Sequence, residues 1–486
     1  MRTAVVAGWM GVLCAASCTD RTLAVAIPHQ DRVALARIPA TGNRDIDILF
    51  VIDDSPSMAD KQQNLRANFT NFIDVLRRIE GGLPNLHIGV VSPDLGTMGT
   101  NDTLPGPSIS GPGGCSGRGK QGELQTRHTP FVTGAFISDV QNSEGTRSRN
   151  YVGSLEDAFS AIAQVGDSGC GFEQPLEAAK RALDGNPANA GFLRSDAYLV
   201  IIFVTDEDDC SLSTSALLAQ TTATLGPRDS FRCTRFGITC DEGGADSRAM
   251  NQIGPKRSCH PDNRSPYLTH IDDYVAFFRS LKPDNPSRVV VAGIMGTPEP
   301  LAVELRASPL MTGEGPIPAL AHSCSYIDSA NRMEVADPPI RLQQFLDAFP
   351  YHSTFASICQ PDLSEGLTRI GELLTSTLPS WCIEGTLADV DPNAVGPQYD
   401  CSVSDITNFG KPNQVETLLP PCDAPGSPET AANKPCWTIA IDRMGQCEAQ
   451  RLMLHIERAQ APAPGSHTVS YCATCDDADH DGICDL

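Results

Sequence analysis

The chain lacks any long run of Lys and Arg and, after its first residues, any apolar run long enough to cross a membrane. Its 36 basic and 59 acidic residues give a formal net charge of −23 over 486 residues. Proteins that bind nucleic acid need clustered positive charge, so nucleic acid is not an expected partner. No segment after the N-terminus reaches the roughly 18 consecutive apolar residues of a spanning helix. The acidic composition suits solubility and cation binding.

Catalytic signatures and fixed-period repeats are missing as well. The sequence has no His-Glu-x-x-His, no Gly-x-Ser-x-Gly, no phosphate loop and no convincing Cys-His arrangement, and its histidines are scattered. We therefore expect a protein that is not an enzyme. A hydrolase with an unrecognised site in one of the long loops is the less favoured alternative.

Residues 1–18 have the features of an export signal. Arg2 precedes an apolar stretch, and three small residues stand just before Cys18. The segment resembles a bacterial lipoprotein signal, although Ala15 stands where that family prefers Leu. The resemblance implies lipidation of Cys18 and attachment to a membrane through it. We expect an exported protein, either a lipoprotein of the cell surface or outer membrane, or a secreted one.

Cysteine usage predicts the same kind of compartment. Setting aside Cys14 and Cys18 leaves an even number of cysteines, distributed from Cys115 to Cys484, which favours disulfides. Four of them lie in one loop-rich stretch and are candidates to pair with one another: Cys210, Cys233, Cys240 and Cys259. Cys472 and Cys475 have the spacing of a redox or zinc motif, but no second pair completes such a site.

Apolar runs of strand length alternate with helical periodicity from Arg44 to about residue 380. Strands are expected at Asp45 to Ile52, Leu86 to Val91, Tyr198 to Thr205, Arg288 to Ile294 and Thr354 to Ile358. Helices are expected around Leu65 to Leu76, with Lys61 turned to solvent, and at Leu155 to Val165, Gln174 to Leu183, Tyr274 to Leu281 and Leu363 to Leu378. This alternation predicts an α/β fold with a doubly wound, mostly parallel sheet that binds ligands at the carboxyl ends of its strands.

The predicted division of the chain has four parts. A signal segment (1–18) precedes an α/β domain (44–380), whose loop insertions are expected near 92–150 and 207–271. A small Cys-rich β domain (381–472) follows, with strands at Trp437 to Ile441 and Leu452 to Ile456. An acidic tail (473–486) ends the chain.

Oxygen-bearing side chains follow the two clearest strands. Asp53, Ser55 and Ser57 come at alternate positions directly after the first strand, and Asp206 ends the central strand. The carboxyl ends of parallel strands meet at one edge of a sheet, so these side chains are expected to converge. Such hard oxygen ligands suit Mg²⁺ or Ca²⁺.

The Asp-x-Ser-x-Ser pattern after a buried strand, with Val204-Thr205-Asp206 ending the central strand, resembles the metal-ion-dependent adhesion site (MIDAS) of von Willebrand factor type A (vWA) domains. The resemblance covers roughly Arg44 to Leu378 and implies a Rossmann-like fold. It implies that Ser55 and Ser57 contact the ion directly, that Asp53 and Asp206 hold it mainly through water, and that an acidic group of a partner completes the coordination.

Glu173 marks a departure from that family. The family places a Thr in the loop before the helix at Gln174 to Leu183, where this chain has Glu173, with Ser168 as the other oxygen source. A third carboxylate ligand would neutralise more of the metal's charge and favour a structural ion or a neutral ligand. The alternative is that Glu173 caps the helix N-terminus.

The C-terminus carries a second candidate calcium site. Asp477, Asp479 and Asp481, followed by Gly482, have the spacing of a calcium loop, and Asp485 lies close behind them. With its flanking cysteines the segment resembles a thrombospondin type 3 repeat, which implies weak Ca²⁺ binding. An acidic, solvated tail is the alternative.

The leading expectation is therefore a metal-dependent binding or adhesion protein at a bacterial cell surface, which engages an unknown protein or glycan ligand through the MIDAS-like site. The alternative is a structural protein of the envelope, in which ions and disulfides only stiffen the fold.

Overall fold

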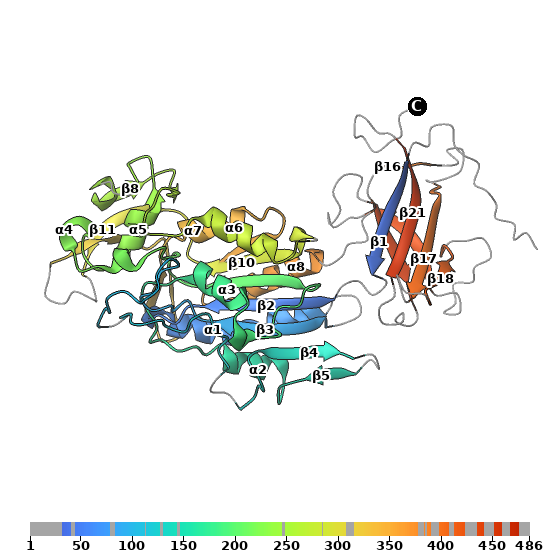
Figure 1. Ribbon diagram of the computed structural model, residues 1–486, viewed down its shortest axis with the longest axis horizontal. Coiled ribbons are helices and arrows are strands. Elements are labelled where there is room, and N and C mark those ends of the chain that lie inside the picture. Colours follow the sequence, from blue (N-terminus) through green and yellow to red (C-terminus); the bar gives the residue numbers. More distant parts are fainter. Residues whose placement is uncertain are drawn as a thin grey trace, which may run out of the picture.

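A seven-stranded sheet forms the centre of the larger part of the molecule (Figure 1). Its strands are β2 (Asp45–Ile52), β3 (Asn85–Val91), β4 (Ile137–Gln141), β5 (Arg147–Arg149), β6 (Tyr198–Val204), β10 (Val289–Met295) and β15 (Ser353–Ser357). They lie in the order β15-β10-β6-β2-β3-β4-β5. The first five in this order are parallel, and β4 and β5 are antiparallel.

The computed structural model describes most of the chain, and every structural statement below concerns that part. It comprises residues 32–39, 44–77, 83–111, 113–126, 130–142, 146–244, 248–283, 285–307, 315–377, 383, 386–389, 398–407, 413–422, 435–441, 452–458 and 467–475. The expected export signal with Cys18, and the acidic loop with Asp477, Asp479, Asp481 and Asp485, lie outside these residues. Within the described part, no helix is both long enough and apolar enough to cross a membrane.

Helices cover both faces of the sheet because successive side chains of a strand point to opposite faces. In β2, Ile48 and Phe50 join one core, and Leu49 and Val51 join the other. The first core is closed by α1 (Ala59–Arg77), α2 (Leu155–Ile162) and α8 (Ser364–Thr377). The second is closed by α3 (Pro175–Leu183), α6 (Ile271–Ser280) and α7 (Ile340–Asp347). The predicted α/β fold with a doubly wound, mostly parallel sheet is therefore confirmed.

All five strands and five helices expected in this part are present to within a few residues, except that α1 begins several residues earlier than expected. The structure adds α7, β4 and β5. The segment near 92–150 was expected to be a loop insertion, but it ends in β4 and β5, which extend the main sheet. The five-residue β4 alternates buried and partly exposed side chains, so it offers no apolar run.

The long insertions form small elements of their own, together at one end of the layered part (Figure 1, left). One sheet joins β8 (Gly254–Lys256), β11 (Leu301–Arg306) and β12 (Ile317–Leu320). Two-stranded sheets join β7 (Ile238–Thr239) with β9 (His260–Pro261), and β13 (Cys324–Ile327) with β14 (Met333–Ala336). Two short helices, α4 (Thr222–Leu225) and α5 (Phe231–Gly237), complete this end.

Six disulfides join cysteines of the described residues, which confirms the prediction made from their number. They are Cys115–Cys170, Cys210–Cys233, Cys240–Cys259, Cys324–Cys359, Cys401–Cys472 and Cys422–Cys436. The four cysteines of the loop-rich stretch pair with one another, as expected. Cys472 is bonded to Cys401, so it does not pair with Cys475 as a redox motif would require. This many disulfides is typical of proteins outside the cytoplasm.

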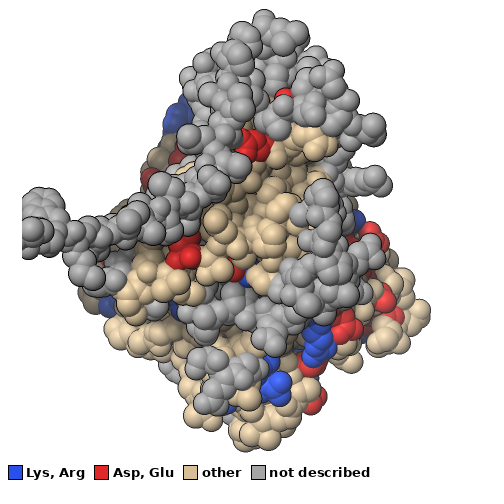
Figure 2. All heavy atoms as spheres, turned by 90° about the vertical axis from the view of Figure 1, so that its right-hand side faces the viewer, with Lys and Arg blue, Asp and Glu red and all other residues tan. Residues whose placement is uncertain are grey.

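A second, antiparallel sheet stands apart from the layered part (Figure 1). This side of the molecule faces the viewer in Figure 2, where acidic and basic side chains are interspersed among the described residues. It joins β1 (Arg32–Pro39), β16 (Thr386–Leu387), β17 (Cys401–Thr407), β18 (Val415–Leu419) and β21 (His467–Cys475). The hairpin of β19 (Cys436–Ile441) and β20 (Leu452–Glu457) shares its core through Val403, Trp437 and Leu454.

This sheet begins before the α/β part, because β1 pairs with β21 from Arg32 opposite Thr474 to Pro39 opposite His467. The β domain expected at 381–472 therefore takes one strand from residues that precede the α/β part. The chain of the α/β part runs between two strands of the second sheet.

Candidate functional site

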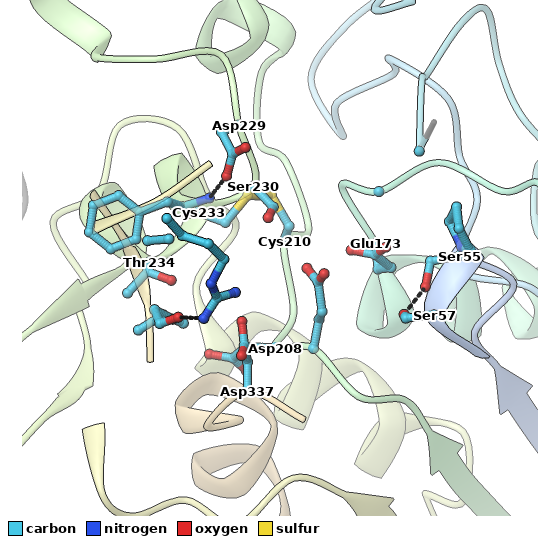
Figure 3. A pocket seen from close by; sticks show the side chains of 18 of the residues that line it. Ser55, Ser57, Glu173, Asp208, Cys210, Asp229, Ser230, Cys233, Thr234 and Asp337 are labelled. Carbon is cyan, nitrogen blue, oxygen red and sulfur yellow. Dashed lines mark hydrogen bonds between the residues drawn. A yellow bond between two sulfur atoms is a disulfide. The ribbon is translucent and has the colours of Figure 1, made fainter. Parts of the chain in front are cut away.

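The loop after β2 folds back on itself through its own polar atoms. The backbone N–H of Ser55 donates to Asp53 Oδ1 at 2.7 Å, and Pro56 begins a short 3₁₀ turn, Pro56–Met58, that leads into α1. Gln62 of α1 donates to the carbonyl of Asp53 at 2.8 Å. As a result the hydroxyls of Ser55 and Ser57 lie side by side, with 3.1 Å between their Oγ atoms (Figure 3).

The end of β6 lies next to this loop because β2 and β6 are neighbours in the sheet, with Ile52 opposite Val204. Ser57 Oγ donates to Asp206 Oδ1 at 3.1 Å, and Thr205 Oγ1 donates to Asp53 Oδ2 at 2.8 Å. The structure therefore brings together the four residues that the sequence proposed for the ion.

Glu173 joins them from the loop before α3. Its side chain is 1% exposed, and its Oε1 has no hydrogen-bond partner among the described residues. Ser168, the other oxygen source considered, is exposed and donates to the neighbouring Asp167.

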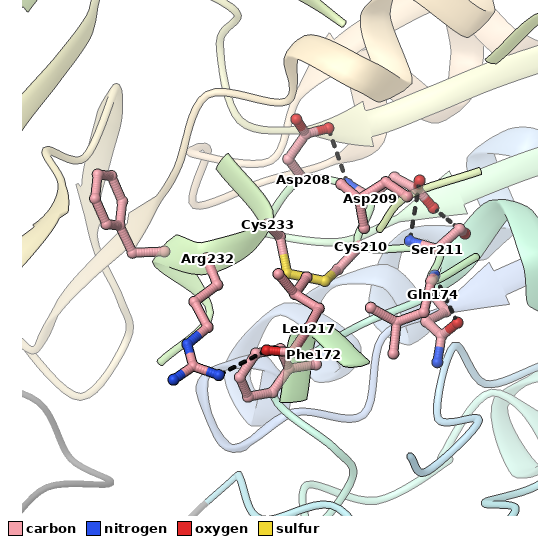
Figure 4. The surroundings of a disulfide bond; sticks show 12 residues. Phe172, Gln174, Asp208, Asp209, Cys210, Ser211, Leu217, Arg232 and Cys233 are labelled. Atoms are coloured by element: carbon pink, nitrogen blue, oxygen red, sulfur yellow. Dashed lines mark hydrogen bonds between the residues drawn. A yellow bond between two sulfur atoms is a disulfide. The ribbon is translucent and has the colours of Figure 1, made fainter. Parts of the chain in front are cut away.

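The alternative role of Glu173 as a cap of α3 is not what the structure has. The first free N–H groups of α3 are taken by the loop after β6: Leu176 N donates to Asp209 Oδ1 at 3.1 Å and Glu177 N to Ser211 Oγ at 3.0 Å. Asp209 and Ser211 of this loop flank Cys210, whose disulfide joins the loop to Cys233 of α5 (Figure 4). The carboxylate of Glu173 is therefore left to face the cluster of acids.

The loop before Glu173 is held close to the motif. Gly169 N donates to the carbonyl of Asp54 at 2.7 Å, and a Cβ atom at Gly169 would lie 2.2 Å from Asp54 Oδ1. Only glycine fits so close an approach. The next residue, Cys170, is fastened by its disulfide to Cys115. The loop that carries Glu173 is thus held both by the backbone hydrogen bond of Gly169 and by the disulfide of Cys170.

Burial and mutual repulsion raise the pKa values of these acids. Burial, and next the charge of Asp206, raise the pKa of Asp53 to about 7. Burial, followed by the charges of Glu207 and Asp53, holds the pKa of Glu173 well above its usual range. Burial also raises the pKa of Asp206, against the opposing effect of Lys61. A bound cation would relieve this repulsion and favour the ionised forms.

Lys61 corrects the prediction from the sequence, which turned this side chain to solvent. It is 1% exposed, and its Nζ lies 3.0 Å from Asp206 Oδ2 and 3.2 Å from Glu334 Oε2. It also donates to the carbonyl of Ser57 at 3.0 Å. Lys61 stands four residues after Ser57 in the first turn of α1, and this spacing was the available signal that it faces the motif.

Two further acids at this edge, Glu207 and Asp337, were not predicted from the sequence. Glu207 directly follows Asp206, and Asp337 comes from the insertions. Asp337 reaches the end of β6 by a backbone hydrogen bond of 2.8 Å, from its N–H to the carbonyl of Asp206. Nothing local in the sequence pairs residue 337 with residue 206.

This arrangement has the donors for a hard divalent cation, namely two hydroxyls and several carboxylates. In the described residues, no group of three or more His, Cys, Asp or Glu side chains is close enough to hold an ion. Any ion here therefore needs the hydroxyls of Ser55 and Ser57 as ligands beside one or two carboxylates. The unpartnered oxygen of Glu173 fits the presence of a cation.

Comparisons with known proteins do not assign the chain. No family model matches it, and no curated protein does. A solved pilus adhesin, SpaC from Lactobacillus rhamnosus GG, is 9% identical with a TM-score of 0.29, over 92% of this chain and 42% of that one. The pilus adhesin RrgA from Streptococcus pneumoniae is 11% identical with a TM-score of 0.22, over 91% of this chain and 58% of that one.

Proximal thread matrix protein 1 from the mussel byssus is 11% identical with a TM-score of 0.27, over 70% of this chain and 50% of that one. The chain spans about half the length of these three structures. TM-scores this low establish neither a shared fold nor a shared function.

Proposed function

We propose that this chain is an exported vWA-domain protein that binds a protein or glycan partner through a metal ion, and that it is not an enzyme. The ion, Mg²⁺ or Ca²⁺, would be held directly by Ser55 and Ser57 with at most two carboxylates, and the remainder of Asp53, Asp206 and Glu173 would hold it through water. The observation that carries the proposal is the 3.1 Å hydrogen bond from Ser57 Oγ to Asp206 Oδ1, which joins the two strand ends. The sheet order and its helices on both faces support it.

The metal would supply positive charge at a carboxyl edge that otherwise holds mainly negative groups. The residues of the chain do the rest: the Ser55 N–H and Thr205 hydroxyl orient Asp53, and Lys61 orients Asp206. A ligand group with a free oxygen would then be attracted to the ion. Lipidation of Cys18 and Ca²⁺ binding by the C-terminal loop are further parts of the proposal.

Calorimetric titration of the metal-stripped full chain with Mg²⁺ and with Ca²⁺ tests the proposal. All titrations use a background in which Asp479→Asn and Asp481→Asn remove the second candidate site. We expect saturable binding that is lost in the Ser55→Ala, Ser57→Ala double variant. Ser168→Ala is the matched control, since this serine is exposed on the neighbouring loop, and it should bind as the parent does. No binding by the parent chain would refute the proposal.

A structural role for the ion is the second candidate, and Glu173 and Lys61 favour it. A third carboxylate and a buried ammonium leave less of the ion's charge for a partner. Capture of surface proteins or glycans in Mg²⁺ and in EDTA separates the two roles. If the ion raises the melting temperature but changes no capture, the role is structural.

A further inference from the structure

A cavity of about 250 Å³ opens beside Ser55 and Ser57, between the strand ends and the insertions (Figure 3). Phe231, Ile317 and Leu320 contribute apolar surface. Six carboxylates are also among its lining residues: Glu173, Glu207, Asp208, Asp209, Asp229 and Asp337. The volume is below that of pockets for drug-sized ligands, so it suits a single side chain or a similarly small group.

Two of the lining acids are used within the fold. Asp208 accepts hydrogen bonds from the backbone N–H groups of Arg341 and Leu342 at 3.0 and 3.1 Å, and so caps the start of α7. Asp209 pairs with the Arg341 guanidinium at 3.0 Å and caps α3. Both carboxylates are therefore already bound by groups of the fold.

Three other lining acids keep oxygen atoms for the cavity. Glu173 Oε1 is buried without a hydrogen-bond partner among the described residues. Glu207 lines the cavity, and its carboxylate forms no ion pair with a described Lys or Arg. Asp337 uses one oxygen, Oδ1, which lies 2.6 Å from His322 Nδ1.

Arg306 is the single Lys or Arg among the residues that line the cavity, and its guanidinium is already engaged. It donates to Glu304 Oε1 at 2.8 Å and to the carbonyl of Leu320. Arg306 therefore does not neutralise Glu173, Glu207 or Asp337. They do not converge closely enough to share one metal ion either. A cation with several N–H donors can reach carboxylates that lie further apart.

We propose that this cavity binds a basic side chain of the protein partner, with its ammonium or guanidinium group between Glu207 and Asp337 and its methylene stem against Phe231 and Ile317. The proposal rests on the proposed function for the existence of a partner. It does not depend on the metal ion. An alkylammonium group also occurs in free amines, so the experiment separates the two sources.

Calorimetry with the full chain tests the proposal with Nα-acetyl-lysine N-methylamide and its arginine counterpart as probes. The norleucine counterpart is the neutral control, and butylamine represents a free amine. We expect at least one basic probe to bind at about millimolar Kd or better, and the norleucine probe not to bind, because a charge-assisted contact is removed. Butylamine binding without binding of either basic probe would overturn the assignment to a side chain.

Variants of the cavity shift the affinity in both directions. Glu207→Gln and Asp337→Asn should each weaken binding at least fivefold, and Arg306→Gln should strengthen it. Glu365→Gln on α8, 86% exposed, is the control with no effect. Melting temperatures of the Glu207→Gln variant should not fall, because a like charge is removed from an acidic cluster. Unchanged affinity in all three cavity variants would refute the proposal.

Titrations in Mg²⁺ and in EDTA keep this proposal separate from the metal site. A chain that binds Mg²⁺ but neither basic probe overturns only the cavity proposal. A chain that binds a basic probe but no metal overturns only the proposed ion.

Discussion

The two ends of β2 each bury an aspartate, and the fold treats the two in opposite ways. Asp47, near the start of the strand, is fully buried, and Arg194 holds both of its oxygens: the guanidinium Nε contacts Oδ1 at 2.8 Å and the backbone N–H contacts Oδ2 at 2.7 Å. Asp53, just past the other end, receives only neutral donors, Ser55 N–H and Thr205 Oγ1. Its neighbours Asp206 and Asp54 are acids.

The comparison shows that Asp47 has a cationic partner of its own, whereas Asp53 has none among the described residues. The nearby ammonium groups of Lys61 and Lys120 pair with its acidic neighbours Asp206 and Asp54. At the start of β2, Arg194 opposes the effect of burial, and the pKa of Asp47 is raised to about 6. At the other end further acids add to the effect of burial. Burying charge without a partner costs several kcal/mol per group, so such burial persists where another cation offsets it. The carboxyl edge is therefore the end at which the proposed cation would offset buried negative charge.

The largest expected effect comes from Lys61→Met, which removes the one buried ammonium of the carboxyl edge. We expect the free energy of unfolding in EDTA to fall by about 3–5 kcal/mol, because Asp206 and Glu334 lose their shared partner. Mg²⁺ should restore part of this loss. Arg77→Met, an exposed ion-pair residue on the same helix, should cost under about 1 kcal/mol in chemical denaturation.

Removing the partner of Asp47, at the other end of β2, should lower the free energy of unfolding by a comparable amount, and Mg²⁺ should not restore it. Arg194→Met leaves Asp47 buried without its guanidinium, and should lower the free energy of unfolding by about 3 kcal/mol. Adding Asp47→Asn should recover part of the loss, because no unpaired charge remains. If Mg²⁺ rescued the Arg194→Met variant, the contrast between the two ends would be wrong.

Asp53→Asn tests the carboxyl edge directly. We expect the affinity for Mg²⁺ to fall at least tenfold, or about 1.4 kcal/mol, while the stability in EDTA changes by less than about 1 kcal/mol. The reason is that the amide keeps much of the hydrogen bonding and removes a repelling charge. Calorimetry and urea denaturation measure the two quantities. A large loss of stability with unchanged affinity would contradict the assignment.

Between pH 8 and pH 6, the affinity for the metal and the stability of the metal-free fold should change in opposite directions. Asp53 has a pKa raised to about 7, so at pH 6 the metal must displace a proton, and its affinity should fall about tenfold from pH 8 to pH 6. In EDTA the native state takes up this proton at higher pH than the unfolded chain does. The metal-free fold should therefore gain stability as the pH falls from 8 to 6. Titrations and melting curves at both pH values check the signs.

The smallest effect is expected for Glu173→Gln. Removing this carboxylate relieves repulsion from Glu207 and Asp53, so the fold should gain about 1 kcal/mol in EDTA. The stabilisation by Mg²⁺ should shrink, and the capture of an acidic partner should improve, if Glu173 is a ligand. A loss of stability in EDTA would instead indicate that the glutamate is held by the fold.

Much of the α/β part could be predicted from the sequence because its signals are local. The apolar runs of β2 and β6 give their positions to within a residue, and the helical spacing of α1 gives its end but not its start. The short half-buried strands of the insertions, such as β11 and β12, have no such run, and β1 gains its strand only by pairing with β21. That pairing joins residues more than 400 positions apart along the chain, beyond the reach of any local pattern.

The candidate site divides in the same way. Asp53, Ser55, Ser57 and Asp206 could be proposed from the sequence alone, because each directly follows an apolar strand and parallel strands end at a common edge. Only the tertiary structure decided that Lys61 is buried against Asp206, that Asp209 and not Glu173 caps α3, and that Asp337 reaches the same edge. Those outcomes depend on which charges meet after the insertions fold over the sheet. Such electrostatic balance is a property of the assembled fold, because each pairing competes with all the others for the same buried space.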